Sequence, residues 1–238
     1  MKTPLYVAIA VVLAACAKQE PPSAVTPPPA TPETAAAATQ APLDVPAGAY
    51  TTDRSHSSLL FRVVHLGFSN YTGRFKTFDA QLQFDPANLA ASSVTVTVDP
   101  KSLDVENPPE GFIAELLGAQ FLEADKFPDL TYRSTAVEST GPNTVKITGD
   151  LTLHGVTHPV VLNAKLNGGY AGHPMDPHAR IGFSARGTLK RSDFGIAYGI
   201  PAPGTTMGVS DEVEVIVETE LSGPKWTPSS NEAAPAQS

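Results

Sequence analysis

The chain lacks several features that would assign it to common protein classes. It has one cysteine, Cys16, among 238 residues, so no disulfide can form within a single molecule. Its most apolar run, residues 5–14, is too short for a membrane-spanning helix, which needs about 20 residues. Charged residues make up only 17% of the chain, and 24 acidic residues outnumber 16 basic ones. This balance argues against a nucleic-acid-binding surface.

The sequence also lacks the motifs of several large enzyme classes. It contains no Gly-x-Ser-x-Gly elbow, no P-loop and no dinucleotide-binding fingerprint. Asp53, His56 and Ser57 lie close together, but such residues at the start of a strand usually satisfy backbone groups of a turn. We therefore expect no catalytic residues and no cofactor, and predict that the chain is not an enzyme.

The histidines do not form a convincing metal-binding pattern. His154 and His158 are four residues apart, a spacing that binds zinc well when a helix places both rings on one face. Gly155 between them indicates a hairpin turn instead. His173 and His178 belong to a predicted loop, where they would bind an ion only opportunistically. No specific metal site is predicted.

The N-terminus has the pattern of an exported lipoprotein. Lys2 and the apolar residues 5–14 predict a signal peptide over residues 1–15. It ends in Leu-Ala-Ala-Cys, so Cys16 is the predicted lipidation site, and the alternative is an ordinary cleavage site beside an incidental cysteine. Ala17 stands where an inner-membrane retention signal would have Asp. The expected location is therefore the cell envelope, with a lipid anchor in the outer membrane and the domain facing the periplasm.

Two polar segments flank one domain of ordinary size. Residues 17–48 contain eight prolines, nine alanines and no aromatic residue, which predicts that residues 16–48, the lipidated cysteine included, are a disordered tether. Residues 223–238 are predicted to be a disordered tail. The remaining residues 49–222 form the expected domain, with 13 basic and 20 acidic side chains.

Most of this domain alternates apolar and polar residues, which is typical of half-buried antiparallel strands. One clear example places Val213, Val215 and Val217 on one face and Glu214 and Glu218 on the other. Similar alternation recurs along the domain between turns rich in Pro, Gly, Asn and Asp. A glycine inside one such pattern, Gly149, suggests a bend or bulge that curves the sheet.

One segment has helical spacing instead. Phe112, Ile113, Leu116 and Leu117 repeat at intervals that place them on one helix face, and Gly118 suits the helix end. The predicted fold class is therefore all-β: an antiparallel barrel of about eight strands with one short helical excursion. At that strand number the interior holds either a packed core or one slender ligand.

Several segments resemble the YceI family, and they occur in the family's order. They are the run 53–75, the segment 121–135, the Leu-Thr-Leu-His-Gly-Val-Thr-His-Pro motif at 151–159, and the Lys-Arg-Ser-Asp-Phe-Gly-Ile motif at 190–196. The resemblance covers essentially residues 49–222. It implies a periplasmic, lipocalin-like barrel that binds a long apolar lipid such as a polyisoprenoid or quinone.

The resemblance also implies a binding site, whose candidate residues fall into two groups. The apolar candidates for the lining of the barrel are Phe61, Val63, Phe75, Phe121, Phe127, Ile147, Leu151, Leu153 and Phe183. The polar candidates, which either orient a ligand's head group or serve the structure, are His65, His154, Arg191 and Asp193.

The expected partners are an isoprenoid-type lipid and a membrane reached through the N-terminal anchor, with no nucleic acid. The expected function is binding, sequestration or transport of that lipid. Two alternatives remain open at this point. One is a solid barrel that serves envelope stress or adhesion by binding a protein partner of unknown identity. The other is an enzyme or sensor for a lipid-like small molecule.

Overall fold

The structure, a computed structural model, describes residues 45–226, all of which belong to one compact unit. The predicted signal peptide, the lipidation site Cys16, most of the predicted tether and residues 227–238 lie outside the described residues. Within the described range, no helix has the length and apolar character needed to cross a membrane.

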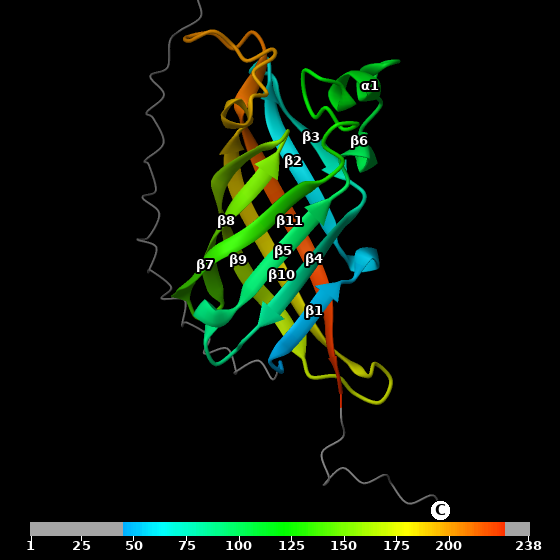
Figure 1. Cartoon of the computed structure of the whole chain (residues 1–238), viewed down its shortest axis with the longest axis vertical. Helices are drawn as coiled ribbons and strands as arrows, with labels where there is room; N and C mark the ends of the chain where they lie inside the picture. The colour runs from blue at the N-terminus through cyan, green and yellow to red at the C-terminus, as the bar shows by residue number, and fades with distance from the viewer. Residues whose placement is uncertain (1–44, 227–238) are drawn as a thin grey trace, which may run out of the picture. The chain divides into compact units, whose positions relative to one another are not determined.

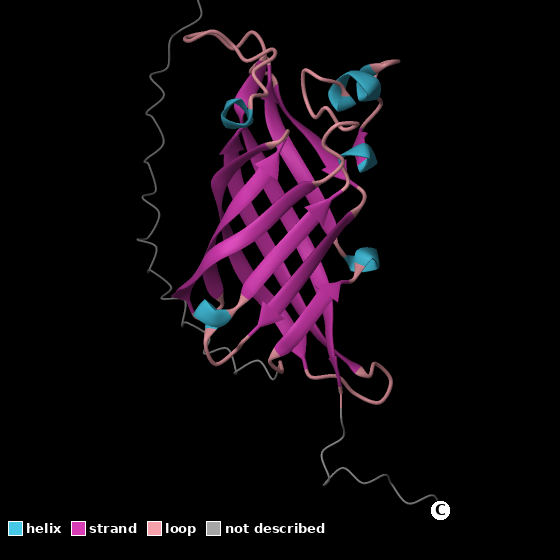
Figure 2. Ribbon diagram, viewed as in Figure 1, coloured by secondary structure: helices cyan, strands magenta, loops and turns pink. Residues whose placement is uncertain are grey.

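Strands account for most of the described residues (Figures 1 and 2). They are β1 (Gly48–Thr52), β2 (Ser58–His65), β3 (Ser69–Phe75), β4 (Phe78–Phe84), β5 (Ser93–Val98), β6 (Leu103–Val105), β7 (Leu130–Gly141), β8 (Thr144–Leu153), β9 (Val156–Tyr170), β10 (His178–Lys190) and β11 (Val209–Lys225). The helical elements are α1 (Phe112–Leu117) and the 3-10 turns η1 (Arg54–His56), η2 (Leu89–Ala91), η3 (Pro100–Ser102) and η4 (Arg191–Phe194).

The strands form one antiparallel sheet that closes into a barrel. The order β1-β4-β5-β7-β8-β9-β10-β11 is closed by a pairing between β11 and β1. Strand β2 follows β1 along the same edge of β11, opposite β10, and β3 and β6 continue the sheet from β2. Along the chain, β1 leads into β2, β3 into β4, and β5 into β6, each pair separated by a short interruption. The eleven segments therefore build eight barrel strands, and the predicted all-β barrel with one short helix is confirmed.

The alternating pattern determines which side chains face the barrel interior. In β4, Phe78, Ala80, Leu82 and Phe84 are buried while the residues between them are more exposed. Gly149 also faces inward, and the partner strand β7 shifts register between Ser134 and Ala136, directly opposite it, so an irregularity lies where a bend or bulge was predicted. The glycine also makes room for the Tyr132 ring, because a Cβ at Gly149 would lie 2.4 Å from Tyr132 Cζ.

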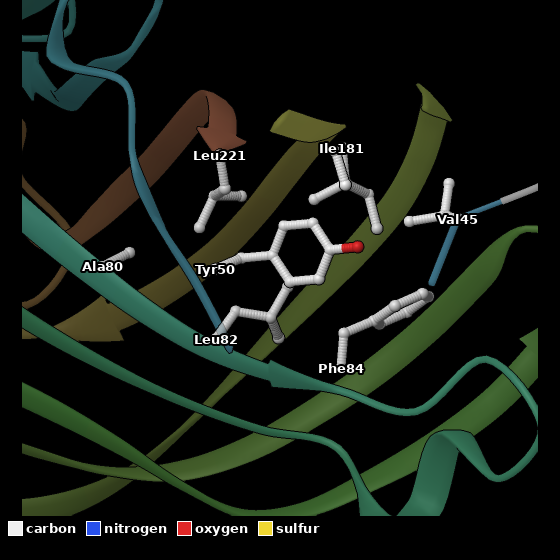
Figure 3. Packing of buried hydrophobic residues seen from close by; sticks show 8 residues of the cluster. Val45, Tyr50, Ala80, Leu82, Phe84, Ile181 and Leu221 are labelled. Carbon is white, nitrogen blue, oxygen red and sulfur yellow. The ribbon is translucent and has the colours of Figure 1, made fainter. Parts of the chain in front are cut away.

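Two clusters of buried side chains form the core. The first includes Val45, Tyr50, Phe84, Ile181 and Leu221 (Figure 3). In it, the Tyr50 ring is 1% exposed and its hydroxyl donates to Pro46 O at 2.6 Å. The second cluster is built around residues of β4, β5, β7, β8, β9 and η4. The two clusters lie along the barrel rather than filling its whole interior.

The barrel has two distinct ends (Figure 1). We call the end that carries α1, η4 and the β2–β3 turn the upper end, and the end that carries η2 and the β7–β8 turn the lower end. Helix α1 ends before Gly118, as predicted, and begins after Gly111. Beyond it, Phe121 and Leu122 pack against the second core cluster, so this excursion covers part of the upper end.

The edges of the domain differ from the predicted bounds of 49 and 222. Val45 is 4% exposed within the first core cluster, so the packed domain includes residues predicted to be tether. Strand β11 continues to Lys225, beyond the predicted start of the tail. Trp226 then packs back on the β9–β10 loop, where its backbone N–H donates to Pro177 O at 2.8 Å. Polar composition predicts a tether, but it does not show at which residue the packed domain begins or ends.

Candidate ligand-binding cavity

The barrel encloses an apolar cavity between the two core clusters. Its volume is about 150 Å³, and its wall draws on strands from all around the barrel. Leu59, Leu82, Val96, Leu162 and Val217 illustrate how the inward-facing side chains of separate strands meet there. A closed cavity of similar volume, lined by apolar side chains, binds small apolar molecules in another protein.

Exposure of the inward-facing side chains is consistent with a hollow interior. Val96, Leu162 and Phe183 point toward the barrel axis, yet each is only half-buried. In a solid barrel, side chains at such positions would pack closely against one another and lose nearly all contact with solvent. The cavity reaches the lower end, where its wall includes Leu89 of η2 and Pro142 of the β7–β8 turn.

Two hydroxyl groups of the cavity wall are already engaged in hydrogen bonds. The Tyr132 hydroxyl donates to Ile147 O at 3.1 Å and to Val160 O at 3.3 Å, and burial raises the pKa of Tyr132 to about 12. The hydroxyl oxygens of Thr219 and Ser57 are 2.9 Å apart. A ligand in this cavity therefore finds mainly apolar surface, and its fit depends on length and width more than on hydrogen bonds.

The structure places two of the nine predicted lining residues in the cavity wall, Ile147 and Phe183. Leu153 is buried in the second core cluster, and Phe75, Phe121 and Leu151 pack against that cluster. These four residues therefore fill the upper part of the barrel instead of lining the cavity.

The other three predicted lining residues also lie outside the cavity wall. Phe61 faces inward but packs on Phe75, with ring centroids 5.7 Å apart, above Gly73. Val63 shares this inward face through its pairing with Val213. Phe127 lies outside the barrel strands and contacts the ring of His154 with centroids 5.4 Å apart. Alternation identified the inward face, but it did not show where along the barrel the interior stays open.

Two of the polar candidates have different surroundings. His65, at the end of β2, is exposed and lies beside the Tyr71 ring. His154 occupies the β8–β9 turn with a φ of 53°. Its Nδ1 donates to Phe194 O at 3.2 Å, and its Nε2 has no hydrogen-bond partner but lies 3.5 Å from a Glu123 carboxylate oxygen. His154 therefore connects the turn, η4 and the excursion that carries α1, and neither histidine is in the cavity wall.

Arg191 acts as a structural residue at the upper end. Its side chain is buried, and its guanidinium donates to the backbone carbonyls of Ser210, Ile196, Tyr198 and Val209 at 2.7–3.1 Å. Burial lowers the pKa of this guanidinium from its ordinary value. With its donors directed at backbone oxygens, Arg191 fixes the loop 195–208 and does not reach the cavity.

Asp193, the last polar candidate, is exposed. The carboxylate that caps η4 belongs instead to Asp211, which accepts from the backbone N–H of Ser192 at 2.9 Å and from its hydroxyl at 2.8 Å. The carboxylate that holds η4 therefore comes from the neighbouring strand β11, and Asp193 does not reach the cavity.

A polar cluster lies on the outer wall of the barrel, at the interruption between β1 and β2. Asp53 accepts from Arg180 at 2.8 Å and from the backbone N–H of Ser55 at 3.0 Å, and His56 Nδ1 lies 3.1 Å from the same carboxyl group. The hydrogen bond with Asp53 raises the pKa of His56, and the same contact lowers the pKa of Asp53. The cluster ties η1 to the barrel wall, outside the cavity.

Comparisons with known proteins agree with this architecture. A family model described as a YceI-like domain matches residues 50–221. A UPF0312 protein of Vibrio cholerae is 38% identical over 189 residues, which cover 78% of this chain and 93% of the relative.

Solved structures show the same fold. A YceI protein from Campylobacter jejuni aligns with a TM-score of 0.58 and 33% identity, covering 68% of this chain and 90% of that one. A polyisoprenoid binding domain from Saccharophagus degradans aligns with a TM-score of 0.54 over 75% of this chain and all of that one. At 15% identity, this second likeness concerns the fold alone.

Proposed function

The chain belongs to the YceI-like domain family, and from this premise we propose that it binds an isoprenoid-type lipid in the barrel and sequesters or carries it in the cell envelope. The observation that carries the proposal is the apolar cavity. Side chains from all eight barrel strands form its wall, and few of them are polar. The polyisoprenoid binding domain of Saccharophagus degradans, which shares the fold, supports the same class of ligand.

The cavity's dimensions favour a slender ligand. Its volume of about 150 Å³ is well below the 300–1,000 Å³ of pockets that hold drug-sized molecules. Part of a single polyprenyl chain suits this space, and a longer chain would extend through the lower end. Each methylene removed from water contributes about 0.8 kcal/mol, so even a short enclosed segment offsets a substantial part of the cost of ordering the ligand.

Extraction of the purified protein tests the proposal. The chain is produced in a bacterial periplasm, extracted with organic solvent, and the extract is analysed by mass spectrometry. We expect a polyprenyl chain or quinone in roughly stoichiometric amount. The variant Ala185→Phe places a ring in the cavity, where it should clash with the ligand. We expect at least about tenfold less copurified lipid, because a loss of about 1.4 kcal/mol in binding free energy lowers the affinity tenfold.

Thr188→Phe is the matched control, since Thr188 is exposed on the same strand and points away from the interior. This control should keep the lipid content of the parent protein. A clean extract from the parent, with no thermal shift on adding quinones, would contradict the proposal and favour a protein-binding module.

We also infer that residues 1–15 direct export and that Cys16 carries the lipid anchor. The support is the small-residue motif that precedes the only cysteine. Mass spectrometry of the purified chain tests this: the mature parent should begin at Cys16 and carry the added mass of lipid there, and Cys16→Ser should carry none. A mature parent chain without lipid at Cys16 would contradict the anchor.

A further inference from the structure

A group of large apolar side chains is exposed at the upper end of the barrel. Phe68 is 83% exposed, Met207 74%, Tyr198 52% and Val64 43%. We call these four residues the tip surface. They come from the β2–β3 hairpin and from the loop 195–208, which meet at the top of Figure 1. Single exposed apolar residues are common in proteins, but four large ones on two adjoining segments at one end of the molecule indicate an interaction site.

The tip surface is held in place by specific contacts. The backbone N–H of Leu66 donates to Gly208 O at 2.8 Å, and that of Val209 donates to Gly199 O at 2.8 Å. Arg191 binds the carbonyls of Tyr198 and Val209 from below. The apolar side chains are therefore presented by an ordered pair of loops, and their exposure belongs to the folded state.

Charge is absent from both loops. No Asp, Glu, Lys or Arg occurs in residues 63–73 or in residues 194–210, although the domain as a whole carries 33 such residues. Charged side chains are costly to move from water into a medium of low dielectric constant, whereas Phe, Met and Val gain by the same transfer. Tyr198 adds an aromatic side chain with a polar tip, which suits the boundary between lipid and water.

We propose that the tip surface docks the barrel on the interface of a lipid bilayer. Loop tips that project from the molecule can insert between lipid head groups, whereas a protein partner would need pockets shaped to receive them. Neutral lipids are the expected surface. The neighbouring excursion exposes Glu106, Glu110 and Glu115, which repel anionic head groups.

This docking is separate from the proposed cargo site. The cavity reaches the lower end, and the described chain also begins and ends there, at Val45 and Trp226. The bilayer contact is thus a second point of attachment, distinct from the predicted anchor at Cys16. Its test uses lipid without isoprenoid, so its outcome does not depend on whether the barrel binds a polyprenyl chain.

Vesicle binding tests the proposal. Residues 16–238 with Cys16→Ser contain every residue of both core clusters and carry no acyl chain. We expect this protein to float with phosphatidylcholine vesicles in a density gradient. The double variant Phe68→Ser, Met207→Ser should bind at least about tenfold more weakly, because two apolar side chains no longer enter the interface.

Met175→Ser is the matched control. Met175 is 91% exposed in the β9–β10 loop, at the lower end of the barrel. It should leave vesicle binding unchanged, and circular dichroism should show the same fold in all three proteins. The proposal fails if the parent does not float with vesicles, or if Met175→Ser weakens binding as much as the double variant. It also fails if the double variant alters only self-association in analytical ultracentrifugation, which would assign the tip surface to a second copy of the chain.

Discussion

Replacing Arg191 by methionine is expected to lower the free energy of unfolding by about 3–5 kcal/mol, because buried carbonyls that lose their donor cost about 1–3 kcal/mol each. The guanidinium donates four hydrogen bonds to backbone carbonyls. Methionine keeps much of the stem but leaves these carbonyls without their donor. Chemical denaturation followed by circular dichroism measures the change.

The loss of stability in Arg191→Met should be concentrated at the upper end of the barrel. Because Arg191 connects η4 to the loop 195–208, its removal should increase proteolysis of that loop before the barrel unfolds. Arg186→Met is the matched control on the preceding strand β10, with a side chain that is 58% exposed and pairs with Glu214. A surface pair of this kind contributes about 0.5 kcal/mol or less. Equal losses in the two variants would contradict the assigned role of Arg191.

The second large effect is expected at Gly149, in the wall of the barrel. Valine is favoured in strands, so Gly149→Val would be neutral or stabilising if only strand propensity mattered. A Cβ at this position would lie 2.4 Å from Tyr132 Cζ and 2.6 Å from Arg133 O. Valine must therefore displace the tyrosine ring and break its two hydrogen bonds. We expect a loss of about 4 kcal/mol or more, from overpacking and unsatisfied groups together.

Two further variants separate these causes. Tyr132→Phe removes only the hydroxyl and should cost about 1–3 kcal/mol, less than Gly149→Val. Thr148→Val changes the adjacent residue, which points away from the Tyr132 ring, and should change stability by about 0.5 kcal/mol or less. Thermal unfolding of the three proteins gives the comparison. If Gly149→Val lowers stability no more than Thr148→Val does, the close packing of Tyr132 on Gly149 does not contribute to the stability of the barrel.

The regular parts of the fold were predictable from the sequence because they follow from local patterns. Alternation in β11 and the spacing of Phe112, Ile113, Leu116 and Leu117 depend on residues only a few positions apart. The closure of β11 on β1 agrees with the predicted barrel. The bounds of the packed domain were less predictable, because Val45 is placed by contacts with distant residues of the first core cluster.

The binding site was less predictable for a physical reason. Alternation places Phe61 and Phe183 on the same inward face, yet only Phe183 borders the cavity. Whether an inward side chain meets a neighbour or open space depends on which residues face it across the barrel. Likewise, nothing adjacent to Arg191 in sequence shows that its guanidinium will meet Val209 O and Ser210 O across η4.

The pairing of the last strand with the first has a consequence for how the protein is made. Strand β11 pairs with β1, β2 and β10, so the barrel remains open until residues 209–225 are available. Contacts between the two ends of a domain form slowly, because a long loop of chain must be closed first. During that interval β2 and β10 expose unpaired edges, which are templates for aggregation. A chain that stops before residue 209 therefore lacks the strand that closes the barrel and keeps these edges exposed.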